Sequence, residues 1–518
     1  MQANNKTANK WIIALSVMLP ALMEVIDTSV ANVALPNMQG SLNAGTDEIT
    51  WVLTSYMVSN AVVLPITGWL SRMFGRKRFL ITCVILFTLS SLLCGAAPNL
   101  ATLIFFRIVQ GAAGGALIPI SQAILLESFP HSEQGMANAI FGIGVMFGPI
   151  IGPALGGWIT DNMTWRWIFY VNIPVGIAAL AMVGRFVTDP PHVKRGKATV
   201  DYWGLSLLTL GIGSLQIILD KGQQDDWFNS PFIVTFTIIS VVSLLLTVWV
   251  ELRHPHPIVN LRLFKNVSFL AGNLVMFMIG FGLYGSLMVI PLFLQTLMGY
   301  TATQAGLVLA PGGVATLLLM PLVGAGLSKV DGRKIVFAGL VISAWSMFIW
   351  RGFPLATSYG DFLWPRIVAG VGLSMLFVPL TTLTLGGMKP EQMGDATGLY
   401  SLLRNIGGSV GIAATSTLLA RYNQMHQNLL VSRLNPFNPV YQDKVQSISQ
   451  GYAARGMGPA DAQQLGLSSV YGLLQQQAAI LSYNRVFWVL GLGFLAVIPF
   501  LLLLKRPKPG AAPAAAAH

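Results

Sequence analysis

Charged side chains inside otherwise apolar stretches of this sequence include Glu24, Asp27, Arg107 and Arg404. A charge at the centre of a helix in lipid costs roughly 2.5 to 3.5 kcal/mol on insertion scales, so such a side chain should face a polar interior and have a partner. Asp27 is the carboxylate that we expect to bind and release a proton, because its affinity for a proton changes when the water around it changes. A purely structural ion pair with Arg107 or Arg404 is the alternative.

Glu24 precedes Asp27 by three residues, so the two carboxylates project from one helical face and can share a polar cavity. Arg107 has Gln110 one helical turn further on, and Arg404 has Asn405 beside it. For Arg107 the alternative is a side chain that extends to the outer membrane interface. We predict that Glu24, Asp27, Arg107 and Arg404 together couple a proton to the function of the protein.

A basic turn with the sequence GWLSRMFGRKR occupies residues 68–78. A basic cluster after an apolar stretch can simply fix membrane orientation. The glycines and the tight turn also suit a gating loop, in which Arg and Lys bind helix ends or carboxylates in one conformation and release them in another. The gating residues that we predict are Gly68, Arg72, Gly75, Arg76 and Lys77.

Glycines recur every four residues in the segment GIGVMFGPIIGPALGG, residues 142–157. Such a stripe lets a second helix approach closely, and the two prolines break backbone hydrogen bonds and bend the helix. A generic packing face would have the glycines alone, so the doubled GPxxGP pattern favours a bend that shapes a gate. The residues of this motif are Gly144, Gly148, Pro149, Gly152, Pro153, Gly156 and Gly157.

Several polar and aromatic residues within the apolar stretches are candidates for a substrate path, although for any single one helix packing is the simpler explanation. They are Tyr56, Asn60, Gln110, Gln122, Asn273, Tyr284, Gln295 and Asn405. The sequence has no Walker A loop, nucleophile elbow or metal-ligand cluster, so we expect no enzyme activity, no metal and no cofactor.

Composition gives the setting for these residues. Of 518 residues, 54% are hydrophobic and 10% charged, which excludes a water-soluble globular enzyme. Fourteen apolar stretches are long enough to span a bilayer as helices. Most Lys and Arg residues fall in the loops of one face when both termini are placed in the cytoplasm. The net charge of +12 therefore orients the helices and is no sign of nucleic-acid binding.

The chain also repeats itself at an offset of about 257 to 259 residues. LSRMFGRK at 70–77 matches LSKVDGRK at 327–334, RIVQG at 107–111 matches RIVAG at 366–370, and an EQ pair recurs at 133 and 391. We predict two six-helix halves with a central cavity, as in alternating-access transporters. The predicted parts are an N-terminal half 1–187, two inserted helices within 188–256, a C-terminal half 257–506 with a long outer loop 421–483, and a disordered tail 507–518.

The motifs resemble the fourteen-spanner drug:proton antiporters of the major facilitator superfamily, of the EmrB type. The turn at 68–78 resembles the superfamily loop after the second span, although Ser71 stands where the family often has an acid. FFRIVQGAAGGALIP at 105–119, GVMFGPIIGPALGGWI at 144–159 and DTSVANVALP at 27–36 are similar to the fourth-span, antiporter and first-span motifs. The resemblance covers nearly the whole chain and assigns proton binding to Asp27.

The resemblance implies an all-α major facilitator fold of 14 transmembrane helices in a bacterial inner membrane, driven by the proton gradient. It implies export of lipophilic, drug-like compounds together with an EmrA-type periplasmic adaptor and a TolC-type outer-membrane channel, for which the 421–483 loop is the predicted docking surface. Export of a specific metabolite, siderophore or lipid by the same fold is the main alternative. A membrane receptor or enzyme that does not transport is a more distant one.

Overall fold

The computed structural model describes residues 9–130, 133–188, 201–254, 257–327, 329–355, 357–432, 434–435 and 437–504. The regular secondary structure within these ranges is helical. The predicted tail 507–518 and most of the basic connection after residue 188 lie outside the described residues. The all-helical prediction is therefore confirmed for the part of the chain that the structure describes.

Eight helices form the N-terminal part. They are α1 Lys10–Leu42, α2 Thr46–Ile49, α3 Trp51–Phe74, α4 Arg76–Gly95, α5 Leu100–Ser128, α6 Gln134–Asn162, α7 Trp167–Tyr170 and α8 Asn172–Phe186. Helix α1 packs on α6, and α5 packs between α3 and α4. Asn99 caps α5 by accepting a hydrogen bond from the Thr102 amide, which fixes where the helix that carries Arg107 begins.

Two further helices, α9 Tyr202–Lys221 and α10 Pro231–Arg253, pack on each other. The C-terminal part then consists of α11 Val267–Thr296, α12 Ala302–Gly326, α13 Gly332–Trp350, α14 Leu363–Leu385, α15 Met393–Val431, α16 Pro439–Ala453 and α17 Pro459–Ala496. Its packing repeats that of the N-terminal part, because α11 packs on α15 and α14 packs between α12 and α13.

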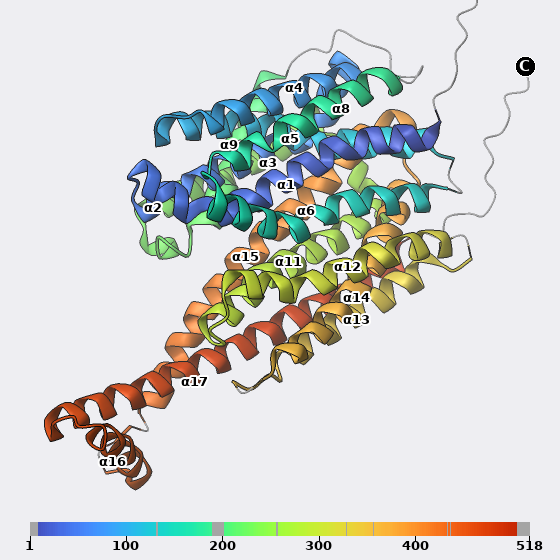
Figure 1. Cartoon of the computed structure of the whole chain (residues 1–518). Coiled ribbons are helices and arrows are strands. Elements are labelled where there is room, and N and C mark those ends of the chain that lie inside the picture. Colours follow the sequence, from blue (N-terminus) through green and yellow to red (C-terminus); the bar gives the residue numbers. More distant parts are fainter. Residues whose placement is uncertain are drawn as a thin grey trace, which may run out of the picture.

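The two parts lie side by side in Figure 1, with α1 to α8 above α11 to α14. They meet where α6 contacts α12 and where α3 and α5 contact α15. Helix α9 contacts both α3 and α15, so the inserted pair touches both parts. Twelve helices of the described residues are long and apolar enough to cross a membrane; the long helices α6 and α15 are not among these twelve but lie within the same bundle.

Two helices extend far beyond the bundle. Figure 1 shows α15 and α17 running together toward the lower left, where α16 lies at their tip. We call residues 421–483 the stalk, and the opposite end of the bundle, which carries the turn between α3 and α4, the Arg72 end. The NPFNP turn at 435–439 and the helix-compatible stretch 460–479 predict that this segment folds as a hairpin. In the structure, α15 and α17 are continuous helices that pass from the bundle into the stalk, and α16 lies between them along the chain.

Candidate functional site

A buried ion pair joins α1 and α5. Asp27 Oδ2 lies 2.7 Å from an Nη atom of Arg107, and the two residues are only 2% and 1% exposed. The other carboxylate oxygen accepts hydrogen bonds from Gln110 Nε2 at 2.9 Å and from Asn172 Nδ2 at 2.7 Å. Both Asp27 oxygens therefore have partners, as a carboxylate away from water requires.

Arg107 is held from several sides. Its Nε donates to the Val52 carbonyl at 3.1 Å, one Nη donates to Gln110 Oε1 at 2.8 Å, and its guanidinium lies 4.2 Å from the centre of the Tyr56 ring. Arg107 therefore faces the protein interior, and the alternative of a side chain that reaches the membrane interface is wrong. Sequence reasoning missed Asn172, because nothing in the sequence placed the start of α8 beside α1.

Glu24 does not share the surroundings of Asp27. Its Oε1 accepts a hydrogen bond from Asn60 Nδ2 at 2.9 Å, and its buried Oε2 has no hydrogen-bond partner among the described residues. Asn405 of α15 donates to Asn60 Oδ1 over a long 3.4 Å, and the positive charge of Arg404 acts on Glu24. The two carboxylates thus belong to different networks: that of Asp27 lies within the N-terminal part, and that of Glu24 spans the contact with α15.

The glycine stripe of α6 faces α1. A Cβ atom added at Gly144, Gly148 or Gly152 would come within 2.4, 2.5 and 2.3 Å of side chains on α1. Gly156 also faces α1, whereas a Cβ at Gly157 would meet no atom within 4 Å. Helix α6 remains continuous through positions 149 and 153, whose side chains lie outside the described structure. This close contact sets the position of α1 along α6, and with it the position of Asp27.

The basic turn at the Arg72 end connects the two parts. Gly75, with a φ of 84°, separates α3 from α4 in a conformation that favours glycine. Arg72 lies 2.5 Å from Asp395 Oδ1 at the start of α15, and Arg76 forms an ion pair with Glu127.

The same turn holds further backbone groups in place. Arg76 also donates to the Pro390 carbonyl at 3.2 Å, and Lys77 donates to the Gly184 carbonyl at 2.7 Å. A Cβ at Gly68 would overlap Asp395, so the glycine makes room for the acid. Asp395 therefore provides the carboxylate that Ser71 lacks, and it comes from the other part of the chain.

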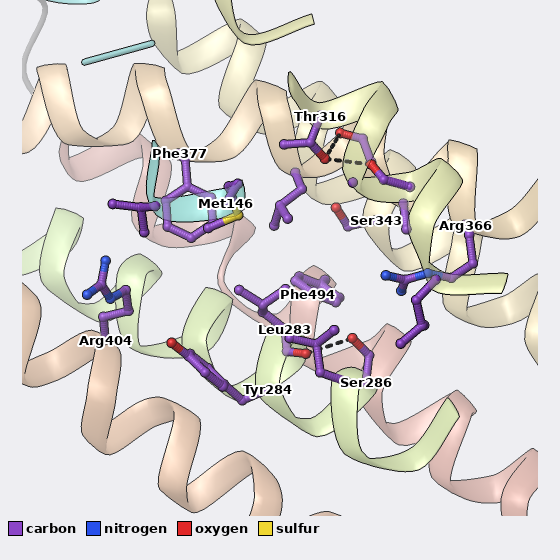
Figure 2. Close-up of a pocket in the computed structure, with 18 of the residues that line it drawn as sticks. Met146, Leu283, Tyr284, Ser286, Thr316, Ser343, Arg366, Phe377, Arg404 and Phe494 are labelled. Atoms are coloured by element: carbon purple, nitrogen blue, oxygen red, sulfur yellow. Dashed lines mark hydrogen bonds between the residues drawn. The ribbon is translucent and has the colours of Figure 1, made fainter. Parts of the chain in front are cut away.

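A cavity lies mainly within the C-terminal part (Figure 2). Its lining includes Tyr284, Arg366, Phe377, Arg404 and Phe494, with Val25, Ile118, Val145 and Met146 from the N-terminal part. The cavity volume is about 100 Å³, whereas pockets for drug-sized ligands are roughly 300 to 1,000 Å³. A drug-sized ligand therefore requires the helices around the cavity to part.

The remaining predicted path residues lie elsewhere. Tyr56 and Gln110 belong to the Asp27 network, and Asn60 and Asn405 to the Glu24 network. Asn273 donates to its own helix at Phe269, Gln122 is buried outside the cavity lining, and Gln295 is exposed near the end of α11. Of the eight, only Tyr284 lines the cavity.

Arg366 is the cavity residue that sequence reasoning missed. The signal was present, because Arg366 begins the RIVAG repeat of the RIVQG motif and is a charge within an apolar stretch, as Arg107 is.

The stalk has its own polar contact and exposed apolar side chains. His426 Nδ1 lies 3.0 Å from Ser482 Oγ between α15 and α17, and burial together with nearby Arg485 lowers the pKa of His426. Near the tip, Phe437 is 90% exposed, and Val440 is exposed as well. These two apolar side chains therefore face solvent near the tip of the stalk.

Comparison with known proteins places this architecture. The family model of the Major Facilitator Superfamily matches residues 17–412. The multidrug export protein EmrB of Haemophilus influenzae is 37% identical over 501 residues, covering 96% of each chain. EmrB of Escherichia coli K12 is 36% identical, covering 96% of this chain and 95% of its own, and the fatty acid resistance protein FarB of Neisseria gonorrhoeae is 39% identical, covering 96% of each.

Solved structures share the fold. A double-tryptophan mutant of XylE has a TM-score of 0.62 at 14% identity, covering 97% of each chain. The human organic anion transporter MFSD10 has a TM-score of 0.59 at 13% identity, covering 94% of this chain and 99% of its own. The family model and the EmrB relatives identify the chain as a multi-pass membrane transporter and not an enzyme. The chain belongs to the major facilitator superfamily and, within it, to the group of EmrB-type export proteins.

Proposed function

We propose that this protein is a proton-coupled antiporter of a bacterial inner membrane that exports lipophilic, drug-like compounds. Its EmrB-type relatives are multidrug export proteins, which supports export. The buried pair of Asp27 and Arg107 is the single observation that carries proton coupling, since it is the most deeply buried of the ion pairs between described residues. No cofactor takes part in this proposal, because the proton gradient supplies the free energy.

In the proposed topology, α6 and α15 cross the membrane together with the twelve apolar helices, so that fourteen helices span it. Both termini and the Arg72 end face the cytoplasm, and the stalk faces the periplasm. The concentration of Arg and Lys at the Arg72 end supports this orientation. The polar composition of α16, which has no buried residue, is consistent with a position in the aqueous periplasm.

The proposed mechanism begins when a proton from the outside binds an Asp27 carboxylate oxygen. The neutral acid no longer holds the Arg107 guanidinium, so the side chains around it rearrange and α1 shifts against the glycine stripe of α6. At the Arg72 end, the contact between Arg72 and Asp395 must open before the two parts can separate on that side. Glu24, whose network reaches α15, serves as a second carboxylate that senses the position of the other part.

Substrate-stimulated proton release by the purified protein tests this proposal. The parent should release protons when lipophilic compounds are added, because proton and substrate compete. Asp27→Asn preserves the shape of the side chain, so it should still bind substrate but release no proton. Proton release by Asp27→Asn at the parental level would contradict the assignment of Asp27.

We further propose that the stalk docks an EmrA-type adaptor, which links the transporter to a TolC-type outer-membrane channel. The length of α15 and α17 and the exposed Phe437 and Val440 support this role. Replacing residues 434–457 with a short glycine-serine linker should leave the bundle inserted in the membrane but abolish co-purification with the adaptor. Unchanged co-purification would exclude the stalk tip as the docking surface.

Export of one lipid class is the second candidate function. FarB, which is 39% identical to this chain, is named for fatty acid resistance. The specific observation in favour of this function is a cationic side chain, Arg366, in the wall of the apolar cavity. A transport assay that compares lipophilic acids with lipophilic cations separates the two functions, because a general drug exporter accepts both and a lipid exporter only the acids.

A further inference from the structure

Arg366 is a buried cation for which the described residues provide no counter-charge. It is 8% exposed, its Nε has no hydrogen-bond partner, and none of the four ion pairs between described residues includes it. An unpaired guanidinium inside the membrane is costly, so such a residue usually marks a functional site. Figure 2 shows its side chain directed into the cavity, opposite Arg404.

A second unsatisfied polar group lies in the same cavity wall. Ser343 of α13 is 4% exposed, and its hydroxyl has no hydrogen-bond partner among the described residues. The neighbouring hydroxyls differ, because Ser286 donates to the Leu283 carbonyl and Thr316 donates to the carbonyls of Gly312 and Gly370. Arg366 and Ser343 are therefore two free donors on one side of the cavity.

The rest of the wall is apolar and aromatic. Met146, Leu283, Phe377 and Phe494 surround the space between the two arginines in Figure 2. A ligand that fits both the two donors, Arg366 and Ser343, and the apolar wall has one small anionic group with two acceptor oxygens and an apolar body. Arg404, on the opposite side, also forms none of the four ion pairs, and its Nε has no hydrogen-bond partner among the described residues. It differs from Arg366 in that its charge acts on the carboxylate of Glu24.

We propose that Arg366 and Ser343 form a carboxylate-binding subsite that selects lipophilic monoanions, such as medium-chain carboxylates, as substrates. The guanidinium donates to the carboxylate oxygens and the Ser343 hydroxyl donates a further hydrogen bond, while the alkyl chain lies against Met146, Phe377 and Phe494. This inference rests on the proposed export function and names its substrate class. Its two donors, Arg366 and Ser343, belong to the C-terminal part, and the subsite does not include Asp27.

Equilibrium binding to the full-length protein in lipid nanodiscs tests the subsite. The probes are octanoate, the neutral octanamide and octyltrimethylammonium, which share one chain length and differ in head-group charge. Isothermal titration calorimetry on the parent should rank octanoate first. Arg366→Gln should weaken octanoate binding roughly ten- to hundredfold, as expected when hydrogen bonds to a charged group are lost, and should leave the other two probes within about twofold.

Two further variants keep the test informative if Arg366→Gln is poorly folded. Arg366→Lys retains the charge and should retain most octanoate binding, within about tenfold of the parent, since only the fork geometry is lost. Ser343→Ala should weaken octanoate roughly three- to tenfold. Thermal unfolding of each variant checks that the protein is intact.

Unchanged octanoate binding in Arg366→Gln would overturn the subsite, as would an equal loss for all three probes in a folded variant. Because this assay has no proton gradient, its result is independent of the proton-release assay on Asp27→Asn. The proton-release assay can therefore refute the proposed export mechanism, and the binding assay can refute the carboxylate subsite, each without the other.

Discussion

The two repeated halves place an arginine at the same point of the same helix but give it different surroundings. Arg107 and Arg366 each stand four residues before a glycine, Gly111 or Gly370, at which a Cβ would come within 2.4 or 2.0 Å of a backbone carbonyl oxygen on the neighbouring helix. Arg107 has Asp27 as its partner, whereas Arg366 has none among the described residues. The helix packing was kept in both copies while the charge balance was not.

The difference follows from two substitutions between the repeats. At the repeat offset of about 257 to 259 residues, Asp27 corresponds to residues 284–286, which are Tyr, Gly and Ser. The match of 70–77 with 327–334 has an offset of 257, at which Tyr56, whose ring covers Arg107, corresponds to Gly313 in the cavity lining. In the N-terminal half, a carboxylate and an aromatic ring therefore occupy the space around the arginine. In the C-terminal half, the corresponding space beside Arg366 is part of the cavity. A duplicated helix bundle can in this way hold the proposed proton site and the proposed substrate site on one scaffold.

The largest expected effect concerns the membrane potential. If the N-terminal half carries a proton inward while the C-terminal half carries a monoanion outward, each cycle moves two charges, which at 100 mV contribute about 4.6 kcal/mol. Exchange of a proton for a monocation moves no net charge. In proteoliposomes with a fixed pH gradient, collapsing the potential with valinomycin should strongly reduce octanoate export and leave octyltrimethylammonium export nearly unchanged. If loss of the membrane potential reduced the export of both probes equally, the proposal that the N-terminal half carries the proton and the C-terminal half the monoanion would be wrong.

Removing Arg107 should lower the stability of the protein much more than removing Arg366. Arg107→Leu leaves Asp27 buried without its counter-charge, so the free energy of unfolding should fall by about 3 to 5 kcal/mol. Arg366→Leu leaves no buried acid behind and should be neutral or stabilising. Thermal unfolding of the two variants in detergent measures the difference, with Asp27→Asn combined with Arg107→Leu as a control that should recover part of the loss. Equal destabilisation by the two single variants would show that Arg366 has a structural partner.

An acid introduced beside Arg366 should give the C-terminal half a buried ion pair like that of Asp27 and Arg107 in the N-terminal half. Ser286 lies within the 284–286 match to Asp27, and it lines the cavity near Arg366 in Figure 2. Ser286→Asp should pair with Arg366 and weaken octanoate binding by about 1.5 to 3 kcal/mol, the range for hydrogen bonds to charged groups. Ser286→Asn, of similar volume, is the matched control and should have a much smaller effect. Competitive displacement of labelled octanoate measures both; similar losses for Asp and Asn would indicate crowding instead of charge.

The fold and the charged residues of the N-terminal half, Asp27 and Arg107, could be predicted from the sequence. Apolar stretches indicated the helices, and the glycines of α6 indicated close packing, because both patterns follow from periodicity along a single helix. The scarcity of buried charge singled out Asp27 and Arg107, which the structure brings together. The structure adds that Glu24 faces a different helix from Asp27, although the two are only three residues apart.

Other features depended on contacts that no local pattern encodes. Asn172 and Asp395 reach their partners across 145 and 323 residues of sequence. The sequence predicts a folded hairpin for the stalk, but the polar, Gln-rich composition ends the apolar pattern there. It therefore gave no sign that helical hydrogen bonds continue from the bundle through that change along α15 and α17. Arg366 was overlooked for a different reason: the repeat identified its position, but the absence of a partner becomes visible only in three dimensions.

The smallest expected effect concerns the size of the hollow. Gly313 lines the cavity where its counterpart Tyr56 fills the other half, so Gly313→Ala should remove room for about one methylene of the bound chain. A buried methylene contributes about 0.8 kcal/mol, so the preferred length in a series of straight-chain carboxylates should shorten by about one carbon. Gly306→Ala on the same helix is the matched control, because a Cβ there meets no atom within 4 Å. If both variants keep the parental chain-length profile, the alkyl chain does not lie against Gly313, and the hollow would accommodate only the head group at Arg366.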